Sequence, residues 1–266
     1  MSLPDDKFAD LRVRLISGAV IAIVGLSAVW FGGAFFLSFL AIVCGILVWE
    51  LVRMLGAGHK QALILGAGAA IGFVAARLLP TGLGLPFLLL PAIAGLAVLG
   101  RQRTLYLVFC AMIVIATFGL SILRDDFGFN WMLWLALVVI ATDVCGYFAG
   151  RLIGGPKIWP QVSPKKTWSG TAGGWIAAGL VGLAYTGVDG VGVEVIGISI
   201  ALSMASQMGD IAESALKRKM GVKDSSSLIP GHGGVFDRFD GVLGASVFLL
   251  LVEQLVDFPP LPNVLG

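Results

Sequence analysis

The sequence predicts an all-α polytopic membrane protein with about nine transmembrane helices, a cytoplasmic N-terminus and a C-terminus outside. Three observations support this prediction: the composition, a succession of long apolar runs, and an uneven distribution of basic residues. Apolar residues make up 58% of the 266 residues and charged residues only 13%, whereas soluble domains have about 45–50% and about 25%. Mean hydropathy is +0.95. We therefore expect lipid to be the main solvent of this chain.

The apolar runs each have the length of a spanning helix, which is about 17–25 residues. In order they cover 15–31, 34–52, 61–79, 83–99, 105–123, 131–149, 170–188, 191–208 and 241–258. The first run follows three basic residues, as in a signal peptide, but it is long and no clear cleavage site follows it. We interpret it as the first spanning helix. Pro86 and Pro91 should kink the fourth, which a packed membrane bundle tolerates.

The basic residues favour one orientation. With nine spans and a cytoplasmic N-terminus, sixteen of the eighteen Lys and Arg residues lie on the cytoplasmic side. Only Arg77 and Arg124 lie toward the outside. Cytoplasmic loops of membrane proteins carry such an excess of positive charge. This distribution supports the number of spans and the orientation together.

The polar residues divide the chain into two regions. Residues 1–130 carry almost no polar side chains in their spans, and we expect them to form a transmembrane scaffold of about five helices. Residues 131–266 form the expected catalytic region, with cytoplasmic loops at 150–168 and 213–240. The net charge of +2 gives no indication of a nucleic-acid partner. The three cysteines, Cys44, Cys110 and Cys145, lie in apolar stretches without disulfide or zinc spacing, so we expect buried thiols.

The inner end of the eighth predicted span carries ionisable side chains. Asp210, Ser214 and Lys217 are spaced by four and three residues, which places them on one face of a helix. Carboxylates within a membrane span are rare and usually functional. A carboxylate, a hydroxyl and an ammonium on one stripe suit a phosphate group with its metal ion.

A second polar cluster precedes the ninth span. Gly233 and Gly234 allow backbone N–H groups to approach an anion closely. Asp237 and Asp240 are three residues apart, so a helix beginning here would stack them on one face. A small number of carboxylates suits Mg²⁺, which keeps water and substrate phosphates among its ligands. The two clusters together predict metal-assisted phosphoryl or nucleotidyl transfer at the membrane surface.

The residues of this region resemble the signature of the phosphatidate cytidylyltransferase family. The similarity covers the run from Ser214 to Asp240, which includes Pro230-Gly-His-Gly-Gly and Asp237-Arg-Phe-Asp. A second block, Asp143 to Arg151 together with Ser163 to Trp168, is similar to that family's other cytoplasmic segment. One position departs from the pattern, because Ser169 stands where the family usually has Glu.

The resemblance implies a reaction between CTP and phosphatidic acid that gives CDP-diacylglycerol and pyrophosphate, catalysed by a multi-pass protein of the cell membrane with its active site facing the cytoplasm. It implies a Mg²⁺ cofactor, with a second cation left open, and suggests a homodimer. The implied metal ligands are Asp210 and Asp237. The candidate catalytic residues are Asp210, Ser214, Lys217, Asp237 and Asp240. The candidate substrate-binding residues are Asp143, Lys165, Lys166, Lys223, Asp224, His232, Gly233, Gly234 and Arg238.

Other interpretations remain open from the residues alone. The lysines could serve as anchors for anionic lipid, Asp143 could bond between helices, and His232 could be only a turn residue. No role is assigned to Glu50. A CTP-dependent transferase acting on another membrane lipid is the nearest alternative. An anion transporter is disfavoured, because transporters place polar groups near the middle of the membrane and on both sides of it.

Overall fold

The fold is described by a computed structural model that covers residues 4–100 and 102–260. The side chains of residues 4–12, 14 and 81 also lie outside this description. The predicted cytoplasmic charges Lys7, Arg12, Arg14 and Arg101 are therefore not placed.

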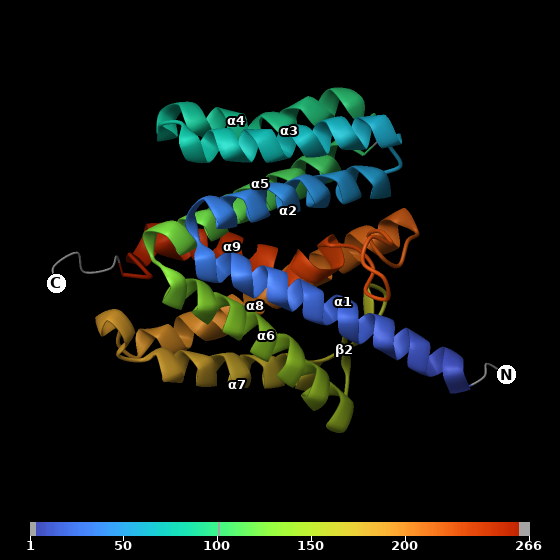
Figure 1. Ribbon diagram of the computed structural model, residues 1–266. Helices are drawn as coiled ribbons and strands as arrows, with labels where there is room; N and C mark the ends of the chain where they lie inside the picture. Colours follow the sequence, from blue (N-terminus) through green and yellow to red (C-terminus); the bar gives the residue numbers. More distant parts are fainter. Residues whose placement is uncertain (1–3, 101, 261–266) are drawn as a thin grey trace. The chain divides into compact units, whose positions relative to one another are not determined.

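Helices make up most of the described chain (Figure 1). They are α1 (Pro4–Phe31), α2 (Gly33–Met54), α3 (His59–Leu78), α4 (Thr81–Val98), α5 (Arg103–Asp126), α6 (Phe129–Leu152), α7 (Trp168–Tyr185), α8 (Glu194–Met220) and α9 (Phe236–Val256), with a short 3₁₀ helix at Val188–Gly190. Each predicted span corresponds to one of these α-helices, so the all-α polytopic class is confirmed. Among the described residues, six helices are long and apolar enough to cross a bilayer, namely α2, α3, α5, α6, α8 and α9. The number of nine spans and the sides of the two termini stay predictions.

A small β-hairpin was not predicted from the sequence. Strands β1 (Lys157–Trp159) and β2 (Ser163–Thr167) pair antiparallel within the stretch expected to be a polar loop. The hairpin leads directly into α7, where Thr167 is the N-cap and its hydroxyl accepts a hydrogen bond of 3.2 Å from the backbone N–H of Gly170. Capping of this kind satisfies one of the N–H groups that a helix start leaves unpaired. Lys165 and Lys166 consequently lie on a strand that is fixed to the start of α7.

The contacts divide the chain into two compact units. The first contains residues 1–114 and 220–238, and the second contains residues 115–219 and 239–266. In the first unit, α3 packs against both α2 and α4; in the second, α6 and α7 lie side by side (Figure 1). Most of the polar segment before α9 thus belongs with the N-terminal helices. The predicted boundary near residue 130 stays a prediction.

Aromatic side chains form part of the core of the second unit. Trp131 and Trp134 are fully buried, and both pack against Phe258 with ring centroids 5.2 and 5.6 Å apart. Each indole N–H has a polar partner at 2.9 Å, which is the Asp189 carboxylate for Trp131 and the Ser199 hydroxyl for Trp134. Satisfying the indole N–H removes the cost of burying it. These two bonds tie α6 to the turn before α8 and to α8 itself.

Small residues allow close packing between α2 and α3 in the first unit. Gly66 of α3 lies so close to Gly45 of α2 that a Cβ atom at position 66 would be 2.6 Å from the Gly45 carbonyl oxygen. The same atom would be 3.1 Å from the Cβ of Trp49. Small residues let helix backbones approach in this way within membranes. The close approach of α2 and α3 therefore depends on glycine at position 66.

Gly66→Ala should therefore destabilise the first unit, by about 1–3 kcal/mol, because the added methyl group overlaps a backbone carbonyl. Gly68→Ala is a matched control on the same helix, since a Cβ at position 68 meets nothing within 4 Å. Unfolding in mixed micelles with increasing denaturing detergent would measure both variants. Equal stability of the two variants would contradict the close approach of α2 and α3.

Candidate active site

The second unit contains a cavity of about 610 Å³ between α6, the β-hairpin, α7 and α8. This volume lies within the range of small-molecule sites, which is about 300–1,000 Å³. Its lining residues are Thr142, Asp143, Gly146, Tyr147, Gly150, Arg151, Lys157, Lys165, Lys166, Thr167, Gly170, Thr171, Gln207 and Asp210. Four of them are basic and two are acidic, which is unusual in a chain with so few charges. The cavity is therefore suited to an anionic ligand.

Glycines bring the walls of the cavity together where α6 meets the start of α7. A Cβ at Gly170 would be 2.6 Å from the carbonyl oxygen of Gly146, and a Cβ at Gly150 would be 2.8 Å from the Thr167 hydroxyl oxygen. Ser169 donates a hydrogen bond to the carbonyl oxygen of Gly154, which fixes the turn between α6 and the hairpin. The residue that departs from the family pattern thus has a structural partner here.

Lys166 and Asp210 form an ion pair at the edge of the cavity. The ammonium nitrogen lies 2.5 Å from Oδ2 of the carboxylate, and both side chains are partly exposed, at 26% and 31%. Ser214 donates a hydrogen bond of 3.2 Å to the other carboxylate oxygen, Oδ1. The predicted stripe on α8 therefore does place Ser214 beside Asp210. The Asp210 carboxylate thus has a cation on one oxygen and a hydroxyl on the other.

Asp240 interacts electrostatically with two other aspartates of the second unit. Asp240 of α9 feels the charges of both Asp210 and Asp143, and Lys217 opposes them. The approach of α8 to α9 depends on glycine, since a Cβ at Gly209 would be 2.3 Å from the Asp240 carbonyl oxygen. The backbone N–H of Gly241 donates to the Asp240 carboxylate at 2.7 Å. A like charge nearby disfavours the ionised form of a carboxylate, and a bound cation would relieve this repulsion.

Lys217 is paired with a carboxylate that the sequence analysis did not consider. Its ammonium group forms an ion pair with Glu213, one turn back along α8. The Glu213 side chain is completely buried and that of Lys217 is 12% exposed. A buried carboxylate depends strongly on such a partner. Lys217 therefore has a structural role in addition to the phosphate contact predicted for it.

In the first unit, Asp237 holds the glycine-rich loop before α9. Its Oδ2 atom accepts hydrogen bonds from the backbone N–H of Gly234 at 2.7 Å, and from the backbone N–H and hydroxyl of Ser225 at 2.9 and 2.8 Å. Gly233 has a φ of +81°, and a Cβ there would be 2.7 Å from the same oxygen. The glycines thus allow the loop to close around a protein carboxylate. Binding of substrate by Gly233 and Gly234 stays a prediction.

The loop also contacts α1. The Nδ1 atom of His232 lies 2.8 Å from the Ser17 hydroxyl, which is 3.0 Å from the Pro230 carbonyl oxygen. Arg238 donates a hydrogen bond of 3.2 Å to the carbonyl oxygen of His232. His232 consequently has a defined place against the first helix, and its predicted contact with substrate stays a prediction.

Glu50 of α2 contacts the glycine-rich loop, and the sequence analysis left it without a role. The carboxylate is fully buried and lies within hydrogen-bond distance of Ser225, Ser226, Val235 and Phe236. The available signal was an acidic residue inside an apolar span, which usually marks function. The family motif does not include Glu50, and its hydrogen-bond partners lie far along the chain.

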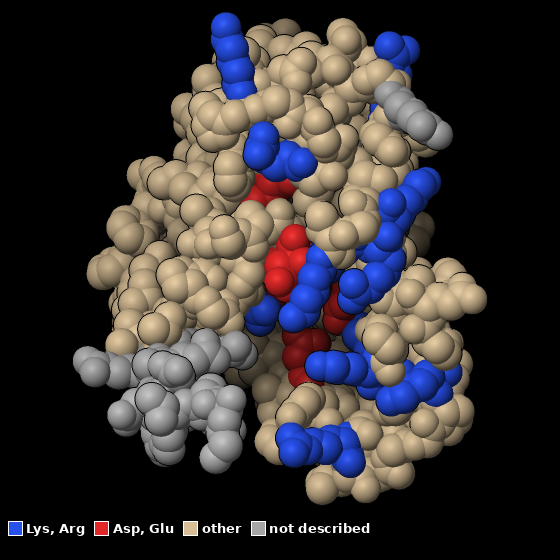
Figure 2. All heavy atoms as spheres, turned by 90° about the vertical axis from the view of Figure 1, so that its right-hand side faces the viewer, with Lys and Arg blue, Asp and Glu red and all other residues tan. Residues whose placement is uncertain are grey.

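The candidate residues therefore form two groups. In the second unit these are Asp143, Lys165, Lys166, Asp210, Ser214, Lys217 and Asp240. In the first unit these are Lys223, Asp224, His232, Gly233, Gly234, Asp237 and Arg238. Lys223 and Asp224 are exposed. On the face drawn in Figure 2, Lys and Arg side chains stand at the surface.

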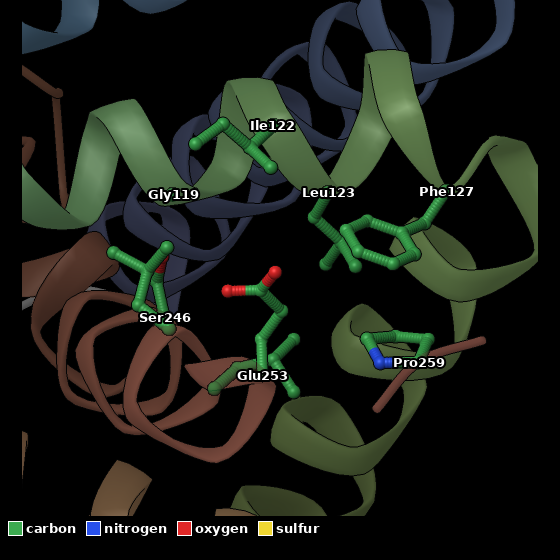
Figure 3. A pocket seen from close by; sticks show the side chains of 9 residues that line it. Gly119, Ile122, Leu123, Phe127, Ser246, Glu253 and Pro259 are labelled. Carbon is green, nitrogen blue, oxygen red and sulfur yellow. The ribbon is translucent and has the colours of Figure 1, made fainter. Parts of the chain in front are cut away.

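A second hollow, between α5 and α9, is unsuited to these substrates. It has a volume of about 10 Å³, roughly the space of one water molecule. Figure 3 shows the carboxylate of Glu253 pointing into it among apolar side chains that include Leu123, Phe127 and Pro259. No basic residue lines it. The larger cavity is therefore the candidate site.

Comparison with known proteins identifies the family. The model of the cytidylyltransferase family matches residues 12–256. The chain belongs to the cytidylyltransferase family. It is 37% identical to a phosphatidate cytidylyltransferase of Brucella suis biovar 1 (strain 1330), over 97% of this chain and 98% of the relative. It is 30% identical to one of Staphylococcus aureus (strain COL), over 88% of this chain and 95% of the relative.

Membership of the cytidylyltransferase family extends the resemblance beyond the two motifs. A relative from Bacillus subtilis (strain 168), also named phosphatidate cytidylyltransferase, is 39% identical over 49% of this chain and 50% of its own length. The family match includes most of the described chain and therefore both groups of candidate residues. An enzyme of this cytidylyltransferase family is a nucleotidyltransferase, so the anion transporter considered from the sequence is set aside.

The buried pair on α8 leads to a test of the two roles of Lys217. Lys217→Ala should lower the free energy of unfolding by about 3–5 kcal/mol, because it leaves the Glu213 carboxylate buried without its ammonium partner. The double variant Glu213→Gln with Lys217→Ala should recover most of that loss. Denaturing-detergent titration would measure the stability of each variant.

Lys219→Ala is the control, since Lys219 is an exposed lysine on the same helix, and it should change stability by no more than about 0.5 kcal/mol. A double variant as unstable as Lys217→Ala alone would contradict the structural role. Normal turnover of CTP by a stable double variant would contradict the phosphate contact.

Proposed function

We propose that the chain transfers the cytidylyl group of CTP to phosphatidic acid, giving CDP-diacylglycerol and pyrophosphate, at the cytoplasmic face of the cell membrane. The observation that carries this proposal is the charged cavity of the second unit, where Lys165, Lys166 and Asp210 line a volume suited to a small anionic substrate. Relatives that match nearly the whole chain bear the name of this activity. The excess of basic residues in the predicted cytoplasmic loops supports the orientation.

The reaction is a substitution at phosphorus. A phosphate oxygen of phosphatidic acid attacks the α-phosphorus of CTP, a new P–O bond forms, and the bond to the β-phosphate breaks. Pyrophosphate leaves with the electron pair of that bond. The attacking phosphate is already an anion near neutral pH, so no strong general base is required. Catalysis then consists of positioning and charge stabilisation.

The residues of the chain supply those two contributions. Lys165 and Lys166 bind the triphosphate in the cavity. Ser214 supports the site by donating a hydrogen bond to the Asp210 carboxylate. Lys217, Lys223 and Arg238 provide further positive charge for the phosphates of the two substrates. Lys166 is paired with Asp210, so a cationic and an anionic group are held side by side. Lys166 can then bind a phosphate, and Asp210 can bind the metal ion that accompanies it.

The acidic residues fit a Mg²⁺ ion that is held partly by substrate. Within the described chain, no three His, Cys, Asp or Glu side chains form a cluster that could hold a metal ion by themselves. Mg²⁺ in nucleotide enzymes is usually bound by one or two carboxylates together with phosphates and water. Asp210 and Asp237 would hold it, and Asp240 adds negative charge near Asp210. When bound, Mg²⁺ neutralises phosphate charge and stabilises the leaving pyrophosphate.

The proposal is tested with the purified chain, radiolabelled CTP and a panel of lipid phosphates. We expect CDP-diacylglycerol to form only when both phosphatidic acid and Mg²⁺ are present. Preference for another lipid phosphate or a lipid alcohol would instead support the alternative transferase. Consumption of neither substrate in lipid nanodiscs would contradict the proposal.

Asp210→Asn and Asp237→Asn should each lower turnover by about a hundredfold or more, since each removes a carboxylate that would hold the Mg²⁺ ion, and with it part of the charge stabilisation of the transferred phosphate. Raised Mg²⁺ should not restore either variant fully. The same assay measures both, with size-exclusion chromatography to check that each purified variant is monodisperse.

Asp257→Asn is the matched control for these variants. Asp257 is exposed after α9 with a φ of 50°, a conformation that asparagine also tolerates. Its turnover should equal that of the unchanged chain. Near-normal turnover by Asp210→Asn or by Asp237→Asn would remove that residue from the site.

A further inference from the structure

Glu50 links both ends of the glycine-rich loop to α2. Its Oε1 atom accepts hydrogen bonds from the Ser226 hydroxyl at 2.5 Å and the Val235 backbone N–H at 2.9 Å. Its Oε2 atom accepts from the Phe236 backbone N–H at 2.7 Å and the Ser225 hydroxyl at 3.2 Å. One side chain therefore holds the beginning of the loop and the start of α9 at the same point.

The four bonds require a carboxylate. Each oxygen faces one backbone N–H, which can only donate. A glutamine has one acceptor oxygen and one NH₂ group, so either orientation of its amide sets a donor against the N–H of Val235 or Phe236. The two serine hydroxyls can rotate to accept, but the backbone groups cannot. The start of a helix also favours a negative charge, and Phe236 is the first residue of α9.

The surroundings leave little room for another arrangement. A Cβ at Gly234 would lie 2.4 Å from Oε1 of Glu50 and 2.0 Å from the Ser225 hydroxyl oxygen. Phe236 is fully buried and packs edge-on against Phe109 at 6.3 Å. A buried ionised group is costly unless it is hydrogen-bonded on every side. The loop meets that requirement in the conformation that the structure shows.

We propose that Glu50 is a positioning residue for cytidylyl transfer. It holds residues 225–236 in the shape that places Asp237 and Arg238 at the start of α9 and His232 on the loop. It contacts Asp237 through a shared partner, because the Ser225 hydroxyl lies within hydrogen-bond distance of both carboxylates, at 3.2 and 2.8 Å. The catalytic consequence of this role rests on the proposed function, whereas the effect of Glu50 on the loop does not.

Hydrogen exchange of Glu50→Gln in nanodiscs separates these two effects. The amides of residues 225–236 should exchange about tenfold faster or more than in the unchanged chain, because two backbone donors lose their acceptor or face another donor. The amides of α3 should be unaffected. Corrected for folded protein, kcat/KM should fall about tenfold or more. The KM for CTP or for phosphatidic acid should rise, which a smaller folded fraction would not produce.

Two further variants complete the experiment. Glu253→Gln removes a carboxylate from α9 in the other unit, where its recorded partner is the neighbouring Gln254, and should change neither exchange of the loop nor turnover. Ser226→Ala removes one of the four bonds and should give a smaller change of the same kind, which provides the test if Glu50→Gln does not fold.

Three results would overturn the proposal. They are unchanged exchange of residues 225–236, an increase shared equally by α3, and a loosened loop with normal kcat/KM. If the wild-type protein made no CDP-diacylglycerol, that result would count against the proposed function instead. The exchange data would still decide whether Glu50 holds the loop.

Discussion

A charged group in apolar surroundings must be compensated by a partner, and both units of the molecule are organised around this requirement. Without such partners a buried ion is strongly unfavourable. On α8, the buried Glu213 is paired with Lys217, and Asp210 is paired with Lys166 of the hairpin. In the first unit, Glu50 is compensated by hydroxyl and backbone donors of the loop before α9. The charges are thus fixed where the helices meet polar segments.

The same compensation explains how a membrane protein can handle two polyanionic substrates. In the proposed mechanism, lysines and carboxylates that hold one another in place would also supply the charges that phosphates and a divalent cation need. The substitution requires no strong base, so the geometry of these charges determines the rate. The glycine-rich loop contributes by closing around Asp237 and Glu50, which orders the start of α9. Neighbouring residues of the glycine-rich loop and the start of α9 therefore have both structural and proposed catalytic roles.

The sequence predicted the helices well because lipid permits few other structures, as every backbone group in a bilayer must be paired internally. It also placed Ser214 beside Asp210, since four residues make about one helical turn. The hairpin was missed because its polar residues lack the apolar alternation of a half-buried strand. Glu50 was left without a role because its partners Ser225 and Phe236 come together with it only in the folded chain. The Lys217–Glu213 pair was not predicted, because Lys217 was assigned to the helix face of Asp210 and Ser214.

In the proposed mechanism, Asp210 and Asp237 both contribute to binding the divalent cation that accompanies CTP. Electron paramagnetic resonance of Mn²⁺, a substitute for Mg²⁺, tests it most directly, in titrations of the unchanged chain and the two Asp→Asn variants with CTP present. We expect saturable Mn²⁺ binding that is weakened about tenfold or more in each variant. Unchanged Mn²⁺ affinity in either variant would contradict the assignment of that aspartate to the metal site.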